Sequence, residues 1–256
     1  MLFRLFFMGI ALVLWKLILL PSVPFSRSKS RTAIYLLFMY ACMCALYFAI
    51  AKWSSPSVRG DDGALSHSLM FAILIVAFSQ YALAFAGVSI HDDVAERNNL
   101  SAAFSAAGFT LGVTCCVAGA NIGDGPGFEV VLFCAALSVT TLLLFWVFIA
   151  QASGVVEEIT IERDLGTGIR CGGWLAGSGA VLGACVAGDW ISLAATMRDF
   201  LRFAWPVAVF AFLFASFERR IYRRSTARRP SMTSSALIAA AMVVGGAVYA
   251  EWIGRH

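Results

Sequence analysis

Two Gly-Asp pairs are the residues of this sequence best suited to chemistry. Asp124 lies in the stretch GANIGDGPG, residues 119–127, and Asp189 lies in the stretch AGDW. The first stretch lacks the G-x-x-x-x-G-K-[ST] pattern of a phosphate-binding P-loop, and its glycines and proline favour a tight turn. Two carboxylates at one membrane surface are also typical of a cation-attracting channel mouth. The alternative is that neighbouring charged residues neutralise them as ion pairs, namely Arg198, Asp199 and Arg202.

The composition indicates which kind of element positions these turns. Of the 256 residues, 60% are hydrophobic and 13% are charged. Soluble domains are about 45–50% apolar and about 25% charged. The chain is therefore predicted to be all-α, a polytopic transmembrane helical bundle surrounded by lipid.

Long apolar runs locate the candidate membrane spans, because a bilayer core of ~30 Å requires ~20 apolar residues of helix. Eight segments qualify: 2–20, 32–52, 69–89, 100–122, 128–150, 168–187, 200–218 and 235–253. The first segment could be a signal peptide, but Lys16 and the lack of a small-residue cleavage site favour a retained helix. Pro206 is expected near the start of the seventh helix, where a proline has no hydrogen bond to lose.

Basic residues predict the orientation. Lys and Arg concentrate in the loops after the first, third, fifth and seventh segments, above all in ERRIYRRSTARRP, residues 218–230. By the positive-inside rule these loops are cytoplasmic and both termini lie outside. Attraction to anionic lipid headgroups, ~1 kcal/mol per basic residue, explains the cluster, and no nucleic-acid partner is expected.

Two of the predicted inside loops have matching sequences. ERNNLSAAFSAAGFTLG, residues 96–112, aligns with ERDLGTGIRCGGWLAG, residues 162–177. The match predicts two parallel helical-hairpin repeats, and its candidate loop or cap residues are Asn98, Asn99, Asp164, Arg97 and Arg163. An Asn or Asp at this place can cap the next helix. The alternative is an ion or partner site at the cytoplasmic mouth.

Glycine spacing predicts which helices meet at the centre. Glycines three or four residues apart allow close approach of helix backbones, and packing drives helix association in lipid. The candidate packing residues are Gly108, Gly112, Gly168, Gly172, Gly173, Gly177, Gly179 and Gly183. The segments 100–122 and 168–187 are therefore expected at the bundle centre or at an interface between copies of the chain.

The remaining motifs do not indicate an enzyme. The sequence has no HExxH, no G-x-S-x-G and no CxxC, and its cysteines all lie in apolar runs. His67 and His91 are expected to be solvated at loop edges. No catalytic residue, metal site or cofactor is predicted. Arg170, one turn into its span, is expected to reach the interface or to pair with Glu162 or Asp164.

Two longer stretches carry a resemblance to a known family. They are ERNNLSAAFSAAGFTLGVTCCVAGANIGDG, residues 96–125, and EEITIERDLGTGIRCGGWLAGSGAVLGACVAGDW, residues 157–190. The region from Leu69 to Trp190 resembles the domain of unknown function 350 family of bacterial inner-membrane proteins. The resemblance implies a bacterial inner-membrane location and an ion-channel-like or envelope-stress role. The expected organisation is an N-terminal hairpin (1–68), a two-hairpin core (69–190) and a C-terminal hairpin (191–256).

Two function classes follow from these observations. A channel-like bundle would line a pore with small polar residues, and Ser101, Ser105, Gly108 and Gly112 lie near one helical face. A non-conducting scaffold or envelope-stress signalling partner, which docks proteins through its cytoplasmic loops, would show the same face. The resemblance favours the channel-like class. The expected partners are the lipid bilayer, cations, and a second copy of the chain or another protein.

Overall fold

The chain folds into a two-layer array of helices. The computed structural model describes residues 30–223 and 230–255. Within these ranges all regular elements are helices, apart from one isolated bridge between Ser54 and Gly123. The all-α class predicted from the composition is confirmed for this part of the chain.

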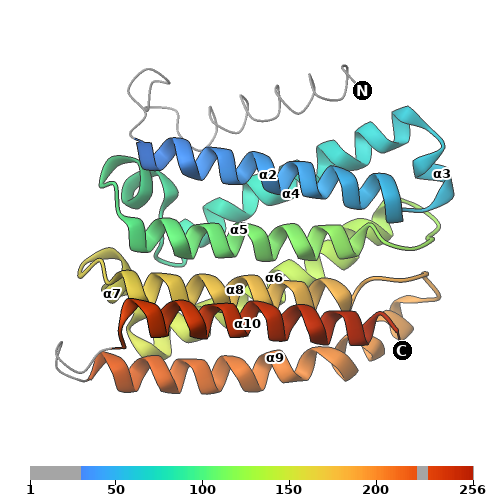
Figure 1. Cartoon of the computed structure of the whole chain (residues 1–256). Coiled ribbons are helices and arrows are strands. Elements are labelled where there is room, and N and C mark those ends of the chain that lie inside the picture. Colours follow the sequence, from blue (N-terminus) through green and yellow to red (C-terminus); the bar gives the residue numbers. More distant parts are fainter. Residues whose placement is uncertain (1–29, 224–229, 256) are drawn as a thin grey trace.

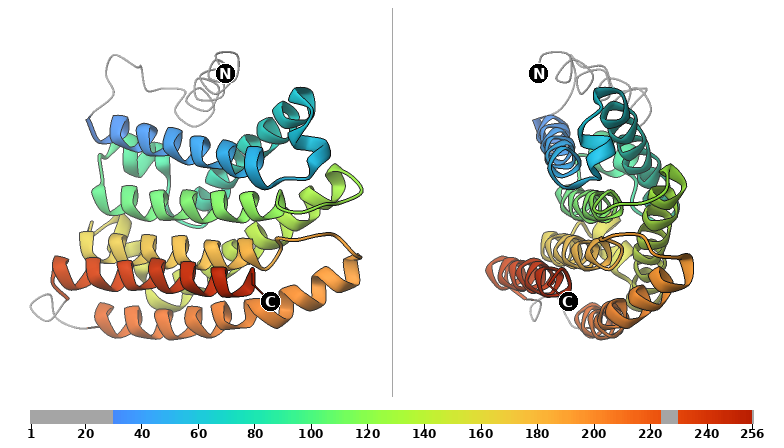
Figure 2. Two further views of the ribbon diagram at one scale, coloured as in Figure 1. Left: turned by 45° about the vertical axis from the view of Figure 1, so that its right-hand side comes forward. Right: turned by 90° about the vertical axis from the view of Figure 1, so that its right-hand side faces the viewer.

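The described residues form long helices, some of which are joined by short helical elements. They are α2 (Ser30–Trp53), α3 (Pro56–Arg59), α4 (Asp62–Phe85), the π-helix η2 (Ile90–Glu96), α5 (Leu100–Ala120), α6 (Phe128–Ser153), α7 (Val155–Thr160), α8 (Leu165–Ala184), α9 (Leu193–Tyr222) and α10 (Met232–Ile253). One layer contains α2, α5, α8 and α10 side by side, and the other contains α4, α6 and α9 (Figure 1). The end view in Figure 2 shows the two layers separately.

Helices of the first layer run parallel to one another. Successive contacts from α5 to α8 keep the same order in both helices: Ser101 with Gly168, Gly108 with Gly172 and Gly119 with Gly183. The same holds between α8 and α10, from Gly173 with Ala239 to Gly177 with Gly246. We call the end at which α5 and α8 begin, marked by Asn99 and Asp164, the cap end. The opposite end, marked by Asp124 and Asp189, is the turn end.

Six of the described helices are long and apolar enough to cross a membrane: α2, α4, α5, α6, α9 and α10. Helix α8 has 20 residues but is not among these six, because its glycines lower its hydropathy. Its residues are nevertheless mostly buried, between α5 on one side and α10 on the other. The predicted first segment, 2–20, lies outside the described residues.

Two predicted helix positions are wrong. The third segment was expected at 69–89, but α4 begins at Asp62, because the Asp61 carboxylate accepts a hydrogen bond from the Gly63 amide at 2.8 Å. It ends at Phe85, just before Gly87 with φ of 101°. As a result, the expected domain boundary after residue 68 falls inside α4.

Pro206 also lies elsewhere than expected. Ser192 caps α9 by accepting a hydrogen bond from the Ala195 amide at 3.2 Å, so the helix begins at Leu193 and Pro206 is well inside it. A proline there removes one helical hydrogen bond and bends the axis. Figure 2 shows that the first half of α9 is inclined to the second.

Candidate functional site

The two carboxylates of the predicted ion mouth lie in adjacent turns at the turn end. The Asp124 amide donates to Asp189 Oδ1 at 2.8 Å, and the Trp190 amide donates to the Asp124 carbonyl at 2.7 Å. Gly123 and Gly188, which precede the two aspartates, have φ of 104° and 125°, a region that strains residues with a Cβ. The two turns therefore hold each other in place, and Asp189 has a structural role in addition to its charge.

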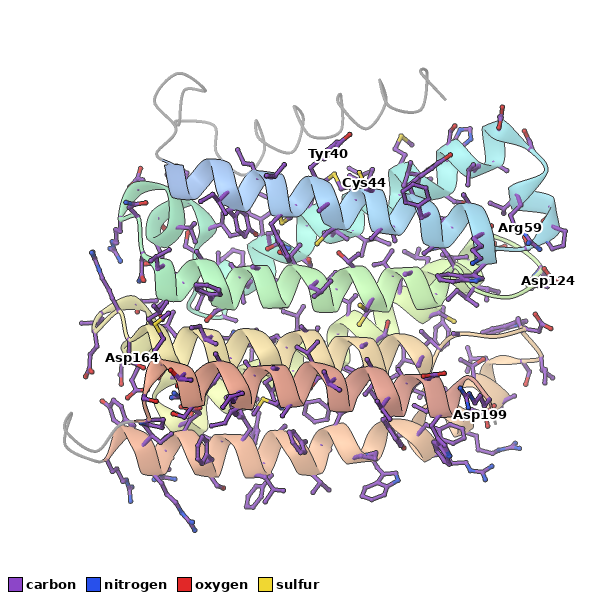
Figure 3. All side chains as sticks on the ribbon, in the orientation of Figure 1. Tyr40, Cys44, Arg59, Asp124, Asp164 and Asp199 are labelled. Atoms are coloured by element: carbon purple, nitrogen blue, oxygen red, sulfur yellow. The ribbon has the colours of Figure 1, made fainter. Side chains whose placement is uncertain are left out.

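A cavity of about 570 Å³ lies beside these turns. Asp124, Asp189 and Asp199 line it together with His67, and its other polar lining includes serine and threonine hydroxyl groups. Among the described residues that line the cavity there is no Lys or Arg, so its formal charge is negative. Asp124 and Asp199 lie at the same end of the bundle in Figure 3.

Asp199 and His67 are members of the cavity lining that the sequence analysis did not assign to the site. Asp199 was expected only as a neighbouring charge, but the early start of α9 places it on the cavity wall. His67 was expected at a loop edge, whereas it lies in α4 with Nδ1 2.8 Å from the Gly63 carbonyl oxygen. Arg198 and Arg202, the expected neutralising cations, are outside the described lining. The Arg202 guanidinium lies instead 5.3 Å from the ring centroid of Phe203.

The predicted packing glycines lie where helix backbones touch. A Cβ atom on Gly108 would be 2.1 Å from the Gly172 carbonyl oxygen, and one on Gly179 would be 2.2 Å from Gly112 Cα. Gly168 and Gly183 meet α5 in the same way, whereas Gly173 and Gly177 meet α10. Helix α8 thus uses two glycine faces, one for each neighbour.

This packing contradicts the predicted pore face. Ser101 and Ser105 are buried, and their hydroxyl groups donate to the carbonyl oxygens of Asp164 at 2.6 Å and Gly168 at 3.3 Å. The face expected to line a pore is therefore the contact surface between α5 and α8. Periodicity alone could not distinguish these cases, since both place small polar residues on one side of a helix.

The matching loops at the cap end have the same local geometry. Asn99 caps α5, accepting from the amides of Ser101 and Ala102 at 2.9 and 3.3 Å. Asp164 caps α8, accepting from the Thr167 amide at 2.7 Å. The preceding residues, Asn98 and Arg163, have φ of 52° and 57°.

Asn99 and Arg97 make further contacts at this end. The Asn99 amide group donates to the Ile159 carbonyl at 2.7 Å, which joins the start of α5 to α7. Arg97 donates to the buried Asp93 carboxylate at 3.1 Å. These residues hold the loops in place, as the capping interpretation requires.

A buried ion pair at the cap end was missed by the sequence analysis. Arg170 and Glu218, with side chains 1% and 0% exposed, form two hydrogen bonds: Nε to Oε1 at 2.6 Å and Nη2 to Oε2 at 2.7 Å. Arg170 Nη1 also donates to Ser235 on α10 at 2.7 Å. The buried ion pair is therefore with Glu218 and not with the expected Glu162 or Asp164, because α9 brings Glu218 directly beside the guanidinium. Asp164 acts on Arg170 through its charge. Glu218 begins the basic cluster ERRIYRRSTARRP, so its sequence context indicated a surface residue.

One group of side chains could hold a metal ion. The donor atoms of His91, Asp92 and Glu96 in η2 lie within 4.8 Å of one another. His91 Nδ1 is 2.8 Å from Asp92 Oδ1. Hydrogen bonds from His91 and then from Ser89 hold the pKa of Asp92 below its usual value. All three donors come from one short helix, in which Asp92 and Glu96 are exposed and His91 is half-buried. The cavity acids, in contrast, come from three separate segments.

Comparison with known proteins adds no assignment. No protein-family model, no curated protein and no solved structure matches the chain.

Proposed function

We propose that the chain is a multi-pass membrane protein that binds cations in its acidic turn-end cavity, at the mouth of an ion pathway. One observation supports this proposal above the others. Asp124, Asp189 and Asp199 come from two turns and one helix and line a single cavity of about 570 Å³, whose described lining contains no Lys or Arg.

Electrostatics favours a cation in such a cavity. The three aspartates are exposed, and carboxylates that line one cavity create a negative potential that attracts cations from solvent. Carboxylate, carbonyl and hydroxyl oxygens are the ligands that alkali and alkaline-earth cations prefer. The turns that carry Asp124 and Asp189 are hydrogen-bonded to each other, so the two backbones are fixed before a cation arrives.

The helix directions support the predicted topology. The long helices α2, α4, α5, α6, α8, α9 and α10 alternate in direction between the two ends of the bundle (Figure 1). With segment 2–20 as a further span, the chain would cross the bacterial inner membrane eight times, as parallel hairpin repeats. The cap end would then be cytoplasmic, since Arg219, Arg220 and Arg223 lie there at the end of α9, and both termini would be outside.

A second candidate is a non-conducting scaffold or signalling partner. The backbone contact between α5 and α8 favours it, because this contact fills the position at which the sequence placed a pore. In this case the cavity would sense cations without passing them. The resemblance to the domain of unknown function 350 family is compatible with both candidates and stays a prediction.

Two measurements on the full chain test the proposal. Cation binding is measured by calorimetry on the purified protein with Na⁺, K⁺ and Ca²⁺, and flux is measured in liposomes. The test variant is Asp124→Asn/Asp189→Asn/Asp199→Asn. The control is Glu129→Gln, an exposed acid at the same end that lies outside the described lining.

The outcomes separate the candidates. Binding and flux that both fall in the triple variant but persist in the control support an ion pathway. Binding without flux under any gradient supports the non-conducting candidate. If the wild type and the triple variant bind each cation equally, the proposed cation site is wrong.

A further inference from the structure

The Thr167 hydroxyl oxygen at the cap end has three close polar neighbours. It lies 2.7 Å from Asp164 Oδ2 and 2.8 Å from Glu158 Oε2, and it accepts a hydrogen bond from Arg170 Nη2 at 3.0 Å. A hydroxyl group has one proton to donate and two lone pairs to accept with. A guanidinium group only donates, so Arg170 uses one lone pair. One lone pair and one proton remain for the two carboxyl groups.

The two carboxyl groups cannot both be ionised in this arrangement. The Thr167 proton can point to only one of them. The carboxyl group that does not receive the Thr167 proton faces the remaining Thr167 lone pair, at a distance typical of an O–H···O hydrogen bond. This contact is attractive only if that second carboxyl group is protonated and donates to Thr167. Either Glu158 or Asp164 is therefore a neutral acid.

Burial and the helix terminus decide which of the two holds the proton. Asp164 is partly exposed and caps α8, a position at which the helix dipole stabilises negative charge. Glu158 is 0% exposed, where an ionised carboxylate loses its hydration at high cost. We propose that Glu158 is a proton-binding site. Its Oε2–H group donates to Thr167, whose hydroxyl group donates to Asp164.

The surrounding charges agree with a neutral Glu158. Arg170 is matched by two hydrogen bonds to Glu218 on α9. Glu158 also acts electrostatically on Glu218 and Tyr222 of α9 and on Cys171 of α8. Asp164, the N-cap residue of α8, acts on Glu218. A charge on Glu158 would add a negative charge to those of Glu218 and Asp164 beside Arg170. On its own segment, Glu157 and Glu162 are also acidic.

Asp93 provides a comparison inside the same molecule. The backbone carbonyl oxygen of Asp93 accepts a hydrogen bond from the backbone amide of Asn99 at 2.9 Å. In the same way, the backbone carbonyl oxygen of Glu158 accepts from the backbone amide of Asp164 at 2.8 Å. The Asp93 carboxylate, however, accepts from Arg97 at 3.1 Å and from the Ser89 amide at 2.9 Å. Both of these partners are donors, so neither contact places an Asp93 oxygen against a lone pair. The same backbone position thus holds an acid that meets donors before α5 and the proposed neutral acid before α8.

Proton binding at Glu158 makes the cap end sensitive to pH. In the unfolded chain an exposed glutamate releases its proton near pH 4.3, so at neutral pH the unfolded state binds fewer protons than the folded state. The free energy of unfolding therefore falls as the pH rises. When Glu158 loses its proton, its carboxylate faces the Thr167 lone pair. The resulting repulsion pushes α7 away from α8.

Infrared spectroscopy of the full chain in lipid at neutral pH tests the proposal directly. A neutral carboxyl group has a C=O stretching band separate from the bands of carboxylates. We expect this band in the wild type and in Asp93→Asn, and its loss in Glu158→Gln. Glutamate labelled with ¹³C at the side-chain carboxyl should shift the band in the wild type, which assigns the band to a glutamate and not an aspartate even if the variant does not fold.

Several results would overturn the proposal. The first is a wild-type spectrum without a neutral-carboxyl band. The second is a wild-type band that shifts only with labelled aspartate, and the third is a band that persists in folded Glu158→Gln. A stability profile gives a second readout. The unfolding temperature of the wild type should fall more steeply between neutral and alkaline pH than that of Glu158→Gln, whose side chain keeps a donor to Thr167. Parallel profiles would contradict an exchangeable proton at this residue.

Discussion

A Cβ atom on Gly108 would lie 2.1 Å from the carbonyl oxygen of Gly172, so α5 and α8 touch backbone to backbone. No side chain can move aside to relieve such a contact, since the obstructing atoms belong to the main chain. The two helices would have to separate along their length to admit even a methyl group. The packing of these two helices therefore closes the space in which a pore was predicted.

Gly108→Ala should destabilise the protein, because the helices must move apart and lose contact elsewhere. Overpacking of this kind costs about 1–3 kcal/mol. Gly245→Ala is the matched control, since its Cβ would have no atom within 4 Å and alanine is favoured in helices by about 0.5–1 kcal/mol. Thermal unfolding in detergent measures both. Equal stability of the two variants would show that α5 and α8 are not in backbone contact in solution.

Arg170→Met should destabilise the protein strongly, because it leaves Glu218 buried without its cation. Removing one partner of a buried pair costs about 3–5 kcal/mol. The double variant Arg170→Met/Glu218→Leu should recover part of this loss. The control is Arg255→Met, which removes a pair with Glu251 that is exposed on both sides, and little change is expected. A double variant no more stable than Arg170→Met alone would contradict the proposed cause.

Asp189→Ala and Asp189→Asn should separate the structural role of this residue from its charge. Both remove the charge, but asparagine keeps an oxygen that can accept from the Asp124 amide. Hydrogen exchange of that amide should accelerate in the alanine variant only, and the alanine variant should lose about 0.5–1.5 kcal/mol. Cation binding should fall in both. Fast exchange in the asparagine variant would indicate that the charge, and not the acceptor, holds the turns together.

Arg163→Gly should stabilise the protein, because Arg163 has φ of 57°. A left-handed conformation costs residues with a Cβ about 1–2 kcal/mol, and glycine avoids this cost while losing some entropy on folding. Arg163→Ala keeps the strain and serves as the control. Chemical unfolding of both variants measures the difference. A glycine variant no more stable than the alanine variant would mean that the backbone relaxes away from this conformation.

The long helices and their parallel neighbours could be predicted from the sequence because the relevant physics is local. A membrane forces every backbone hydrogen bond to be satisfied within the helix, so apolar length alone locates α5, α6 and α10 to within a few residues. Capping by Asn99 and Asp164 involves amides two or three residues away. The glycine spacing of α8 predicts that another helix packs closely against it, but it does not indicate which helix this is.

Only the tertiary structure decided which distant groups meet. Arg170 and Glu218 are 48 residues apart, and nothing in their local patterns pairs them. Asp199 joins the cavity only because Ser192 starts α9 early, and the serines of α5 face α8 rather than a pore. Each of these contacts depends on how whole helices are placed against one another. That placement is decided by the sum of many side-chain contacts across the bundle, which no single stretch of sequence contains.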